Sequence, residues 1–467
     1  MRYKKEHENI LLGEGILMNN LEQKPTKTRL GVLMLLFIAV AINYMDRANL
    51  SVAGSAIQSQ FELSSTELGI LFSAFTWSYA VAQVPVGVLL DKIGPRLLYG
   101  AAISIWGLFT FLMAFSAHSI LATSSASFAF LIFCRILIGI SEAPAYPSNT
   151  KIASLWFPNK ERARAISTYS SAQYIGLAIF TPVLAIMVGD LGWESVFYFS
   201  GGIAIIYGFI WYFFYRDPRD SKNANQAELD YIKHNGGYNP DIDGTKKAEK
   251  VLWSEVIFAI RQRRVWGIFI AQFAASSTLY FFLTWFIIYL QKGLNLSIDK
   301  AGFMACVPYI MAMVGVLVGG TISDMLLKHG YSTTIARKVP MTVGMLLSAV
   351  LCLANFFENS PWIAIGILSI AFCANAGSNL GWVAMSDIMP KKMMGTVGGI
   401  LNLFGNLSGI ITPIVFGSLL QSANNFHFAM YYIAAVTFFG AIGFWFVVDK
   451  LEPIDLEPEE GKRIESL

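Results

Sequence analysis

Long apolar runs alternate with short polar segments along most of the chain. Each run has about the 20 residues with which a helix crosses the hydrocarbon core of a bilayer. The runs cover residues 30–57, 68–90, 97–117, 128–149, 164–188, 194–215, 265–290, 302–327, 337–357, 361–385, 394–420 and 428–449. The pattern predicts an all-α membrane protein with twelve transmembrane helices.

Composition supports this interpretation, because 55% of the 467 residues are hydrophobic and only 14% are charged. Soluble domains carry roughly 25% charged residues. The four cysteines lie inside apolar runs without paired spacing, which is typical of small core residues and not of metal ligands or disulfides. They are Cys134, Cys306, Cys352 and Cys373. We expect no metal and no cofactor.

The basic residues are distributed unevenly between the two sides of the predicted membrane protein. Most of the 34 Lys and Arg residues lie in the tails and the even-numbered connections, whereas the odd-numbered connections contain only Lys292 and Lys300. Basic residues favour the cytoplasmic side of a membrane. We therefore expect a multi-pass inner-membrane protein with both termini in the cytoplasm. The net charge of +3 averages a basic rim over a nearly uncharged one, so it implies no nucleic-acid partner.

The spans divide into two groups of six on either side of a long polar connection. This division predicts cytoplasmic tails at 1–29 and 450–467, helical bundles at 30–215 and 265–449, and a cytoplasmic linker at 216–264. A motif recurs in both halves, as "GVLLDKIGPR" from Gly87 and "GTISDMLLKHG" from Gly320. We expect each Gly to permit close helix approach. We expect the Asp four residues later, Asp91 or Asp324, to meet a neighbouring helix end or a basic side chain.

Two predicted spans contain charged residues well inside the apolar run. Asp46 and Arg47 lie in the first span, and Arg135 and Glu142 lie seven residues apart, on one face, in the fourth. Neighbouring residues of a helix point about 100° apart, so Asp46 and Arg47 need separate partners, which we expect to find in the fourth span. A charge inside a bilayer costs at least a few kcal/mol, which favours a functional role over an inert buried salt-bridge cluster.

These four charges predict a proton-coupled site for an anion. A carboxyl group removed from water favours its neutral form, whereas an arginine keeps its charge. Protonation of both acids would leave two guanidinium groups to bind an anionic substrate. All five histidines lie in tails or connections, so histidine is a poor candidate for the proton carrier.

Several segments together are similar to one group of transporters. The recurring Gly-Asp motif resembles that of the major facilitator superfamily. "NYMDRANLSVAG", "FSAFTWSYAVAQVPVG", "RILIGISEAPAYPSN" and "LNLFGNLSGIITPIVFG" resemble its anion:cation symporter family, and most closely the bacterial permeases for glucarate, galactarate and galactonate. The resemblance covers Leu30 to Asp449. It implies the major facilitator fold of two pseudo-symmetric six-helix bundles.

The resemblance also implies a role for each matching residue. Asp46 and Glu142 would be protonation sites, with Arg135 coupled to Glu142, and Arg47 would bind the substrate carboxylate. Further substrate-binding residues would be Tyr44, Tyr79, Gln173, Asn379, Trp382 and Asn402. The tyrosines could equally be interfacial anchors or core aromatics, and the amides could be interhelical hydrogen-bonding groups. In the seventh span Ile287 replaces a family proline, which predicts the loss of a kink.

Other classes of membrane protein fit less well. The chain has no Gly-x-x-x-x-Gly-Lys-Ser/Thr loop for an ATP-driven pump, and a channel does not need two repeated halves around a central site. An enzyme would need a nucleophile or a metal cluster near the acids. We therefore predict a monomeric proton symporter that imports a sugar acid of the glucarate or galactarate type by alternating access. Another organic anion, such as galactonate or a hexuronate, is the alternative substrate.

Overall fold

The computed structural model describes residues 24–117, 123–238 and 252–454, and these residues form helices without strands. The first half contains α2 (Thr28–Gln60), α3 (Ser65–Ile93), α4 (Pro95–Met113), η1 (Ala114–Ala117), α5 (Ser124–Glu142), α6 (Ala145–Trp156), α7 (Asn159–Leu191) and α8 (Glu194–Phe214). The connection contains η2 (Pro218–Asp220), α9 (Gln226–His234) and α11 (Trp253–Arg261). The second half contains α12 (Arg263–Thr284), α13 (Phe286–Ile288), η3 (Tyr289–Gly293), α14 (Ile298–Lys328), α15 (Thr333–Ser348), η4 (Ala349–Phe357), α16 (Pro361–Ser378), α17 (Gly381–Ile388), η5 (Lys391–Met393), α18 (Met394–Ala423) and α19 (His427–Val447).

The membrane-spanning elements agree with the predicted all-helical membrane fold. Among the described residues, 11 helical segments are long and apolar enough to span a bilayer, and a bent pair within α3 raises the number to 12. The pair, Ser65–Gln83 and Pro85–Ile93, is bent by 60°. Proline lacks an amide hydrogen and collides with the preceding turn, which explains the bend.

Three other predicted spans are interrupted. The fourth breaks after Glu142, where Pro144 has no amide hydrogen to donate to the preceding turn, and it resumes as α6. The tenth breaks at Asn379 and Leu380, between α16 and α17. The seventh is interrupted at Trp285, where α12 ends, and it continues through α13 into a π-helical turn, η3. The break is therefore present although Ile287 replaces the family proline.

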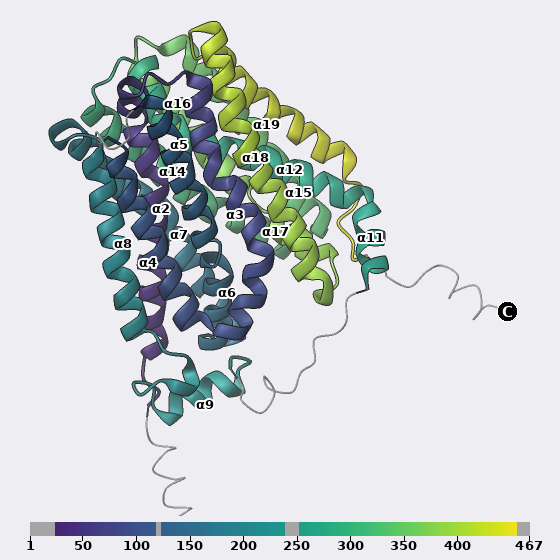
Figure 1. Ribbon diagram of the computed structural model, residues 1–467. Coiled ribbons are helices and arrows are strands. Elements are labelled where there is room, and N and C mark those ends of the chain that lie inside the picture. The colour runs from purple at the N-terminus through teal and green to yellow at the C-terminus, as the bar shows by residue number, and fades with distance from the viewer. Residues whose placement is uncertain (1–23, 118–122, 239–251, 455–467) are drawn as a thin grey trace, which may run out of the picture.

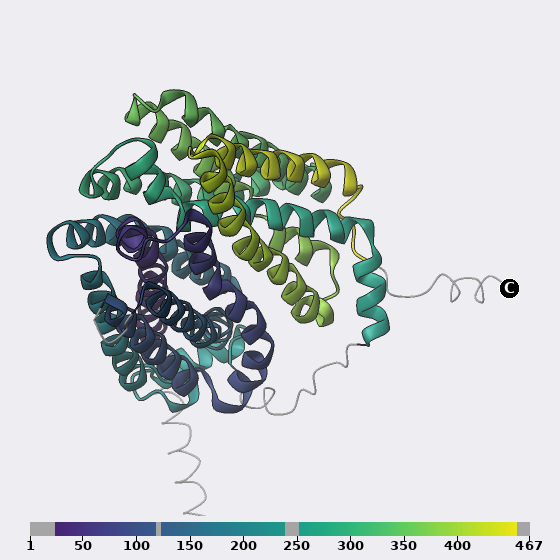
Figure 2. The ribbon, with the colours of Figure 1, turned by 45° about the horizontal axis from the view of Figure 1, so that its top comes forward.

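The two halves of the chain lie side by side (Figures 1 and 2). We call the face that carries the start of α2 and the end of α19 the terminal face, and the opposite one the distal face. In Figure 1 the halves lean together at the distal face, at the top, and their helix ends diverge toward the terminal face. The most extensive packing between the halves joins α3 to α18 and α7 to α14.

Glycines bring the helices of the two halves close together near the distal face. A methyl group added to Gly69 in α3 would collide with the backbone carbonyl of Pro413 in α18, and one added to Gly417 would collide with the carbonyl of Ser65. Between α7 and α14, a methyl group on Gly302 would collide with the side chain of Ala185. Small residues at these positions let backbones approach closely, as in other membrane helix pairs.

Helix α9 of the predicted linker is bound to the terminal face of the first half. Glu228 is fully buried and lies 3.0 Å from a guanidinium nitrogen of Arg29, at the start of α2. Arg29 also lies 3.0 Å from Glu161, in the first turn of α7, and Tyr231 donates a hydrogen bond to Glu161. The linker therefore contains an ordered helix that joins the ends of α2 and α7. The segments 1–23, 239–251 and 455–467 of the predicted tails and linker lie outside the described residues.

The recurring Gly-Asp motif makes the predicted ionic contacts but not the predicted close packing. Asp91 lies 2.8 Å from the Lys151 ammonium, and Asp324 lies 3.8 Å from Arg337. Methyl groups added to Gly87 or Gly320, however, would find no atom within 4 Å. The expectation that these glycines permit close approach is wrong for this conformation, because both face away from the neighbouring helices.

Candidate functional site

The charged residues of the first and fourth spans meet in the interior of the first half. Arg47 donates hydrogen bonds to Oε2 of Glu142 from Nε, at 3.2 Å, and from a terminal guanidinium nitrogen, at 3.0 Å. Glu142 is fully buried and is the last residue of α5. Arg135 lies two helical turns before Glu142 on the same face of α5. It interacts electrostatically with both Asp46 and Glu142. The expected approach of spans one and four is therefore observed, and the direct ion pair joins Glu142 to Arg47 rather than to Arg135.

Asp46 belongs to the same buried cluster, although it points into a different part of it. Its Oδ1 accepts a hydrogen bond of 2.9 Å from Asn49, which also donates to Ser200 of α8. Thr110 lies beside Asp46 and Asn43 lies beside Glu142. One oxygen of each acid, Oδ2 of Asp46 and Oε1 of Glu142, nevertheless lacks a well-formed hydrogen bond among the described residues. A buried carboxylate oxygen without a donor is costly, and a proton on the acid lowers that cost.

Aromatic rings surround the Arg47 guanidinium. Its central carbon lies 4.7 Å from the ring centroid of Phe75, 5.2 Å from that of Tyr79 and 5.3 Å from that of Tyr44. The central carbon of the Arg135 guanidinium lies 5.0 Å from the ring centroid of the same Phe75. Aromatic faces attract cations. These rings therefore hold both guanidinium groups in place without neutralising their charge.

The predicted Tyr44 and Gln173 are joined through a residue that the sequence analysis missed. The hydroxyls of Tyr44 and Tyr146 are 3.2 Å apart, and the Tyr146 hydroxyl donates to the Gln173 side-chain oxygen at 3.4 Å. Tyr146 stands four residues after Glu142, although a helix break separates them. Its place one helical turn beyond a predicted site residue is the signal that could have identified it.

The second half contributes residues to the same region. Arg47 and Arg135 line a small cavity of about 20 Å³ together with Tyr280 and Thr284 of α12, close to the volume that one water needs. Tyr280 donates a hydrogen bond of 3.4 Å to Asn406 of α18. Neither Tyr280 nor Asn406 was among the predicted site residues.

The three predicted residues of the second half are placed differently from one another. Asn402 of α18 donates a hydrogen bond to Gln83 of α3, which directly precedes the bend in that helix, so this bond joins the two halves. Asn379 is exposed at the end of α16, and Trp382 is 44% exposed and packs against Gly398. None of the contacts described for Asn379 and Trp382 joins them to the charges of the first half.

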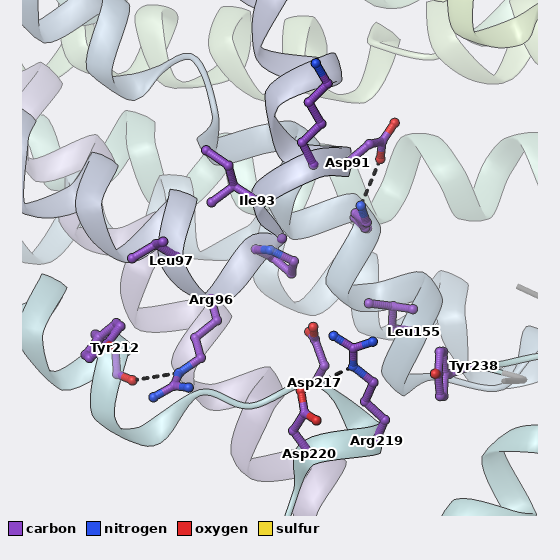
Figure 3. Close-up of a pocket in the computed structure, with 14 residues that line it drawn as sticks. Asp91, Ile93, Arg96, Leu97, Leu155, Tyr212, Asp217, Arg219, Asp220 and Tyr238 are labelled. Carbon is purple, nitrogen blue, oxygen red and sulfur yellow. Dashed lines mark hydrogen bonds and ion pairs between the residues drawn. The ribbon is translucent and has the colours of Figure 1, made fainter. Parts of the chain in front are cut away.

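A larger cavity lies elsewhere, at the terminal face beneath the connection from α3 to α4 (Figure 3). Its volume is about 460 Å³, and its lining includes none of the ten predicted site residues. Asp91 and its partner Lys151 lie at its edge, and Arg96 donates a hydrogen bond to the backbone carbonyl of Tyr212 (Figure 3). This cavity is distinct from the central charge cluster.

Comparison with known proteins decides the family. A family model described as the Major Facilitator Superfamily matches residues 36–413, and a second match covers 329–466. The chain belongs to the major facilitator superfamily. As a member of this superfamily it is a multi-pass membrane transporter and not an enzyme.

Relatives of the chain within the superfamily match most of its length. It is 37% identical to the probable galactarate/D-glucarate transporter GudP of Escherichia coli strain K12, over 94% of this chain and 98% of that protein. It is 39% identical to a D-galactonate transporter of Escherichia coli O6:H1, over 92% of this chain and 98% of that protein. A crystal structure of a D-xylose-proton symporter is similar in fold, with a TM-score of 0.70 at 16% identity, over 90% of this chain and 98% of that one.

Proposed function

We propose that this transporter is a proton-coupled symporter that imports an anionic sugar acid across the inner membrane. The observation that carries the proposal is the buried ion pair between Arg47 and Glu142, which lies beside Asp46 and Arg135 and against the second half of the molecule. Such charges inside a membrane protein mark substrate and proton pathways. The names of the relatives, which are carriers of galactarate, glucarate and galactonate, support the substrate class.

Glu142 competes with the substrate for the same guanidinium in this proposal. While Glu142 is ionised, it occupies Arg47 through two hydrogen bonds. Protonation of Glu142 weakens that pair and frees Arg47 to bind a substrate carboxylate bidentately. Proton binding and anion binding therefore favour each other, which is the requirement for symport. Asp46 is the second proton site, and Arg135 positions both acids.

We propose an orientation of the molecule in the membrane from the charge of its faces and the contacts between its halves. We propose that the terminal face lies in the cytoplasm, because it is rich in basic residues. The glycine contacts between the halves lie near the distal face, and α3 bends beyond the Gln83–Asn402 hydrogen bond. We take the described conformation as closed to the outside. The two bundles, 30–215 and 265–449, rock as domains to expose the central site to either side in turn.

The substrate is proposed to be a six-carbon aldarate, with an aldonate such as galactonate as the second candidate. Asn379 adds an amide donor for a further polar group of the substrate. The second candidate is supported by the 39% identity to a D-galactonate transporter. In both cases Arg47 binds one carboxylate, and Tyr44, Tyr79, Gln173, Trp382 and Asn402 bind the rest of the molecule.

Uptake by the purified protein in proteoliposomes tests the proposal. Labelled glucarate, galactarate and galactonate would be offered with an acidic exterior, with equal pH on both sides, and with a protonophore. Accumulation above equilibrium that requires the pH gradient is the expected result, and neutral sugars should not compete. Uptake that ignores both the gradient and the protonophore would contradict symport. Galactonate that outcompetes both aldarates would overturn the aldarate preference alone.

A further inference from the structure

A row of contacts leads from Arg47 to the distal face along the seam between α2 and the seventh span, which comprises α12, α13 and η3. The residues on α2 are spaced four, three and four apart, so they form one stripe of the helix. They are Arg47, Ser51, Gly54 and Gln58. The facing residues in the second half recur every fourth position. They are Tyr280, Thr284, Ile288 and Lys292.

The three outer pairs of the two stripes contact each other, and the innermost pair, Arg47 and Tyr280, lines one small cavity. Ser51 donates a hydrogen bond of 2.8 Å to the backbone carbonyl of Thr284. A methyl group added to Gly54 would lie 3.0 Å from the Ile288 side chain. At the outer end, the Lys292 ammonium donates a hydrogen bond of 2.7 Å to the side-chain oxygen of Gln58. Separation of the halves at the distal face would expose both stripes as the walls of a path that ends at Arg47.

This path has a cation at each end. Gln58 follows Arg47 by 11 residues of continuous helix (58 − 47 = 11), which corresponds to about 16 Å at 1.5 Å per residue. Lys292 therefore lies roughly that far from Arg47 along the seam. An anion released by Lys292 would move between Ser51 and Thr284 to reach Arg47, the cation at the inner end.

The rest of the distal face makes Lys292 unusual. The short connections and helix ends at this face carry mainly acidic residues, which are Glu62, Glu67, Asp190, Glu194, Asp299 and Glu358. The lysine and arginine residues among the described positions of these connections are Lys292 and Lys300, and His427 at the start of α19 is paired with Glu358. Lys300 lies in the first turn of α14, away from the stripe on α2. An acidic surface repels an anion, so a cation on the seam gives the anion one favourable point of approach.

We propose that Lys292 is a second anion-binding residue of the transport path, which binds a carboxylate of the incoming substrate at the distal mouth. When the seam opens, the ammonium exchanges its hydrogen bond with Gln58 for the carboxylate, and the substrate then moves inward to Arg47. The proposal rests on the proposed transport of an anion. It assigns to Lys292 a role in substrate entry and not in the central site.

The test compares Lys292→Gln with Lys300→Gln and Gln58→Ala in cells that express the transporter and have no other carrier for labelled glucarate. KM and the maximal rate of uptake would be measured at low and high ionic strength. Removal of a charge at the entrance lowers the rate of association and its dependence on salt. Lys292→Gln should raise KM about 3- to 10-fold at low salt, flatten the rise of KM with salt, and leave the maximal rate within about twofold. Lys292→Arg should behave like the wild type.

The control variants separate binding by charge from a merely structural contact. Lys300→Gln removes an equal charge from the same face, and Gln58→Ala breaks the hydrogen bond but keeps the ammonium. Equal effects of Lys292→Gln and either control, or an unchanged salt dependence in Lys292→Gln, would overturn the role of Lys292. A wild-type protein that transports no sugar acid would instead overturn the proposed function.

Discussion

Arg47 is the residue on which the proposed chemistry depends, because its planar guanidinium reaches Glu142 with two nitrogens and lies against three aromatic rings. A lysine ammonium keeps the charge but offers neither a planar fork nor a face that stacks on rings. Substitution of Arg47 by lysine therefore tests whether the site needs only a positive charge or also the planar shape of the guanidinium.

Arg47→Lys should lower the kcat/KM of uptake severely although the formal charge is unchanged. Loss of a bidentate charged hydrogen bond costs roughly 1.5–3 kcal/mol, or about 10- to 150-fold in rate. Initial rates of glucarate uptake in proteoliposomes measure the effect, with the amount and thermal stability of the protein as controls. A lysine variant with wild-type KM would mean that Arg47 is a structural residue.

The two buried acids carry the coupling in the proposed mechanism. Asp46→Asn and Glu142→Gln should each abolish accumulation driven by a pH gradient, because neither side chain can then carry a proton. Exchange of internal for external substrate should persist, since it needs no net proton movement. Counterflow and gradient-driven uptake, measured on the same proteoliposomes, separate the two activities. Full accumulation by both variants would rule out these acids as the proton sites.

At the scale of residues, the sequence identified the charged cluster but not its pairing. Isolated charges inside apolar runs are visible without a structure, because their burial is costly. The choice between Arg47 and Arg135 as the partner of Glu142 depends on the rotation and shift of α2 against α5, which helical spacing within one chain segment does not contain. Tyr280, Asn406 and Gln83 cannot be identified from the sequence for the same reason, whereas the position of Tyr146 four residues after Glu142 is a signal that the sequence does contain.

At the scale of elements, the number and positions of the spanning helices followed from hydrophobic length, but their interruptions did not. The breaks after Glu142 and near Pro85 coincide with prolines and could have been anticipated. The breaks at Trp285 and Asn379 have no proline at the break, so the positions of prolines do not predict them. Helix α9 lay in a segment predicted as a plain polar linker, because its anchoring to Arg29 and Glu161 joins residues far apart in sequence.

Two adjacent glycines of α14 provide a matched test of helix packing. A methyl group at Gly319 would collide with the backbone of Gly377 in α16, whereas one at Gly320 would meet no atom within 4 Å. Gly319→Ala should therefore destabilise the protein by about 1–3 kcal/mol through overpacking. Gly320→Ala should be neutral or slightly stabilising, because alanine favours the helix.

Thermal unfolding of the two purified variants in the same detergent measures this difference. Gly320 is the glycine of the recurring Gly-Asp motif, so its variant also tests whether that motif packs closely. A Gly320→Ala variant as unstable as Gly319→Ala would show that Gly320 does pack closely in another conformation, contrary to its open surroundings here.

At the scale of the whole molecule, the two halves meet along extended seams, and the proposed transport cycle requires these seams to separate at the distal face. The contacts of Thr66 with Ser418 and Gln421 lie at the outer end of the α3–α18 seam. The Thr66 hydroxyl donates a hydrogen bond of 3.3 Å to the Ser418 hydroxyl, and the Thr66 backbone amide donates one of 3.3 Å to the side-chain oxygen of Gln421. The repeat of six and six spans predicted two halves, but nothing in a single sequence states which ends of the halves are in contact.

A larger side chain in this seam should shift the conformational equilibrium of the transporter. Gly69 packs against the Pro413 backbone so closely that any side chain would collide, whereas Gly87 of the same helix has open surroundings. Gly69→Val should therefore disfavour the described conformation and populate states that are open at the distal face, because a change that destabilises one state shifts the population toward the other.

The reporter is Thr66→Cys in a protein whose four native cysteines are replaced by serine, labelled with a membrane-impermeant maleimide from the distal side. Labelling should be several-fold faster with Gly69→Val than without it, and unchanged by Gly87→Val. Uptake should fall with Gly69→Val, since a cycle that cannot close at the distal face cannot release substrate on the other side. Equal labelling rates in all three proteins would contradict the assignment of this seam as the part of the molecule that opens.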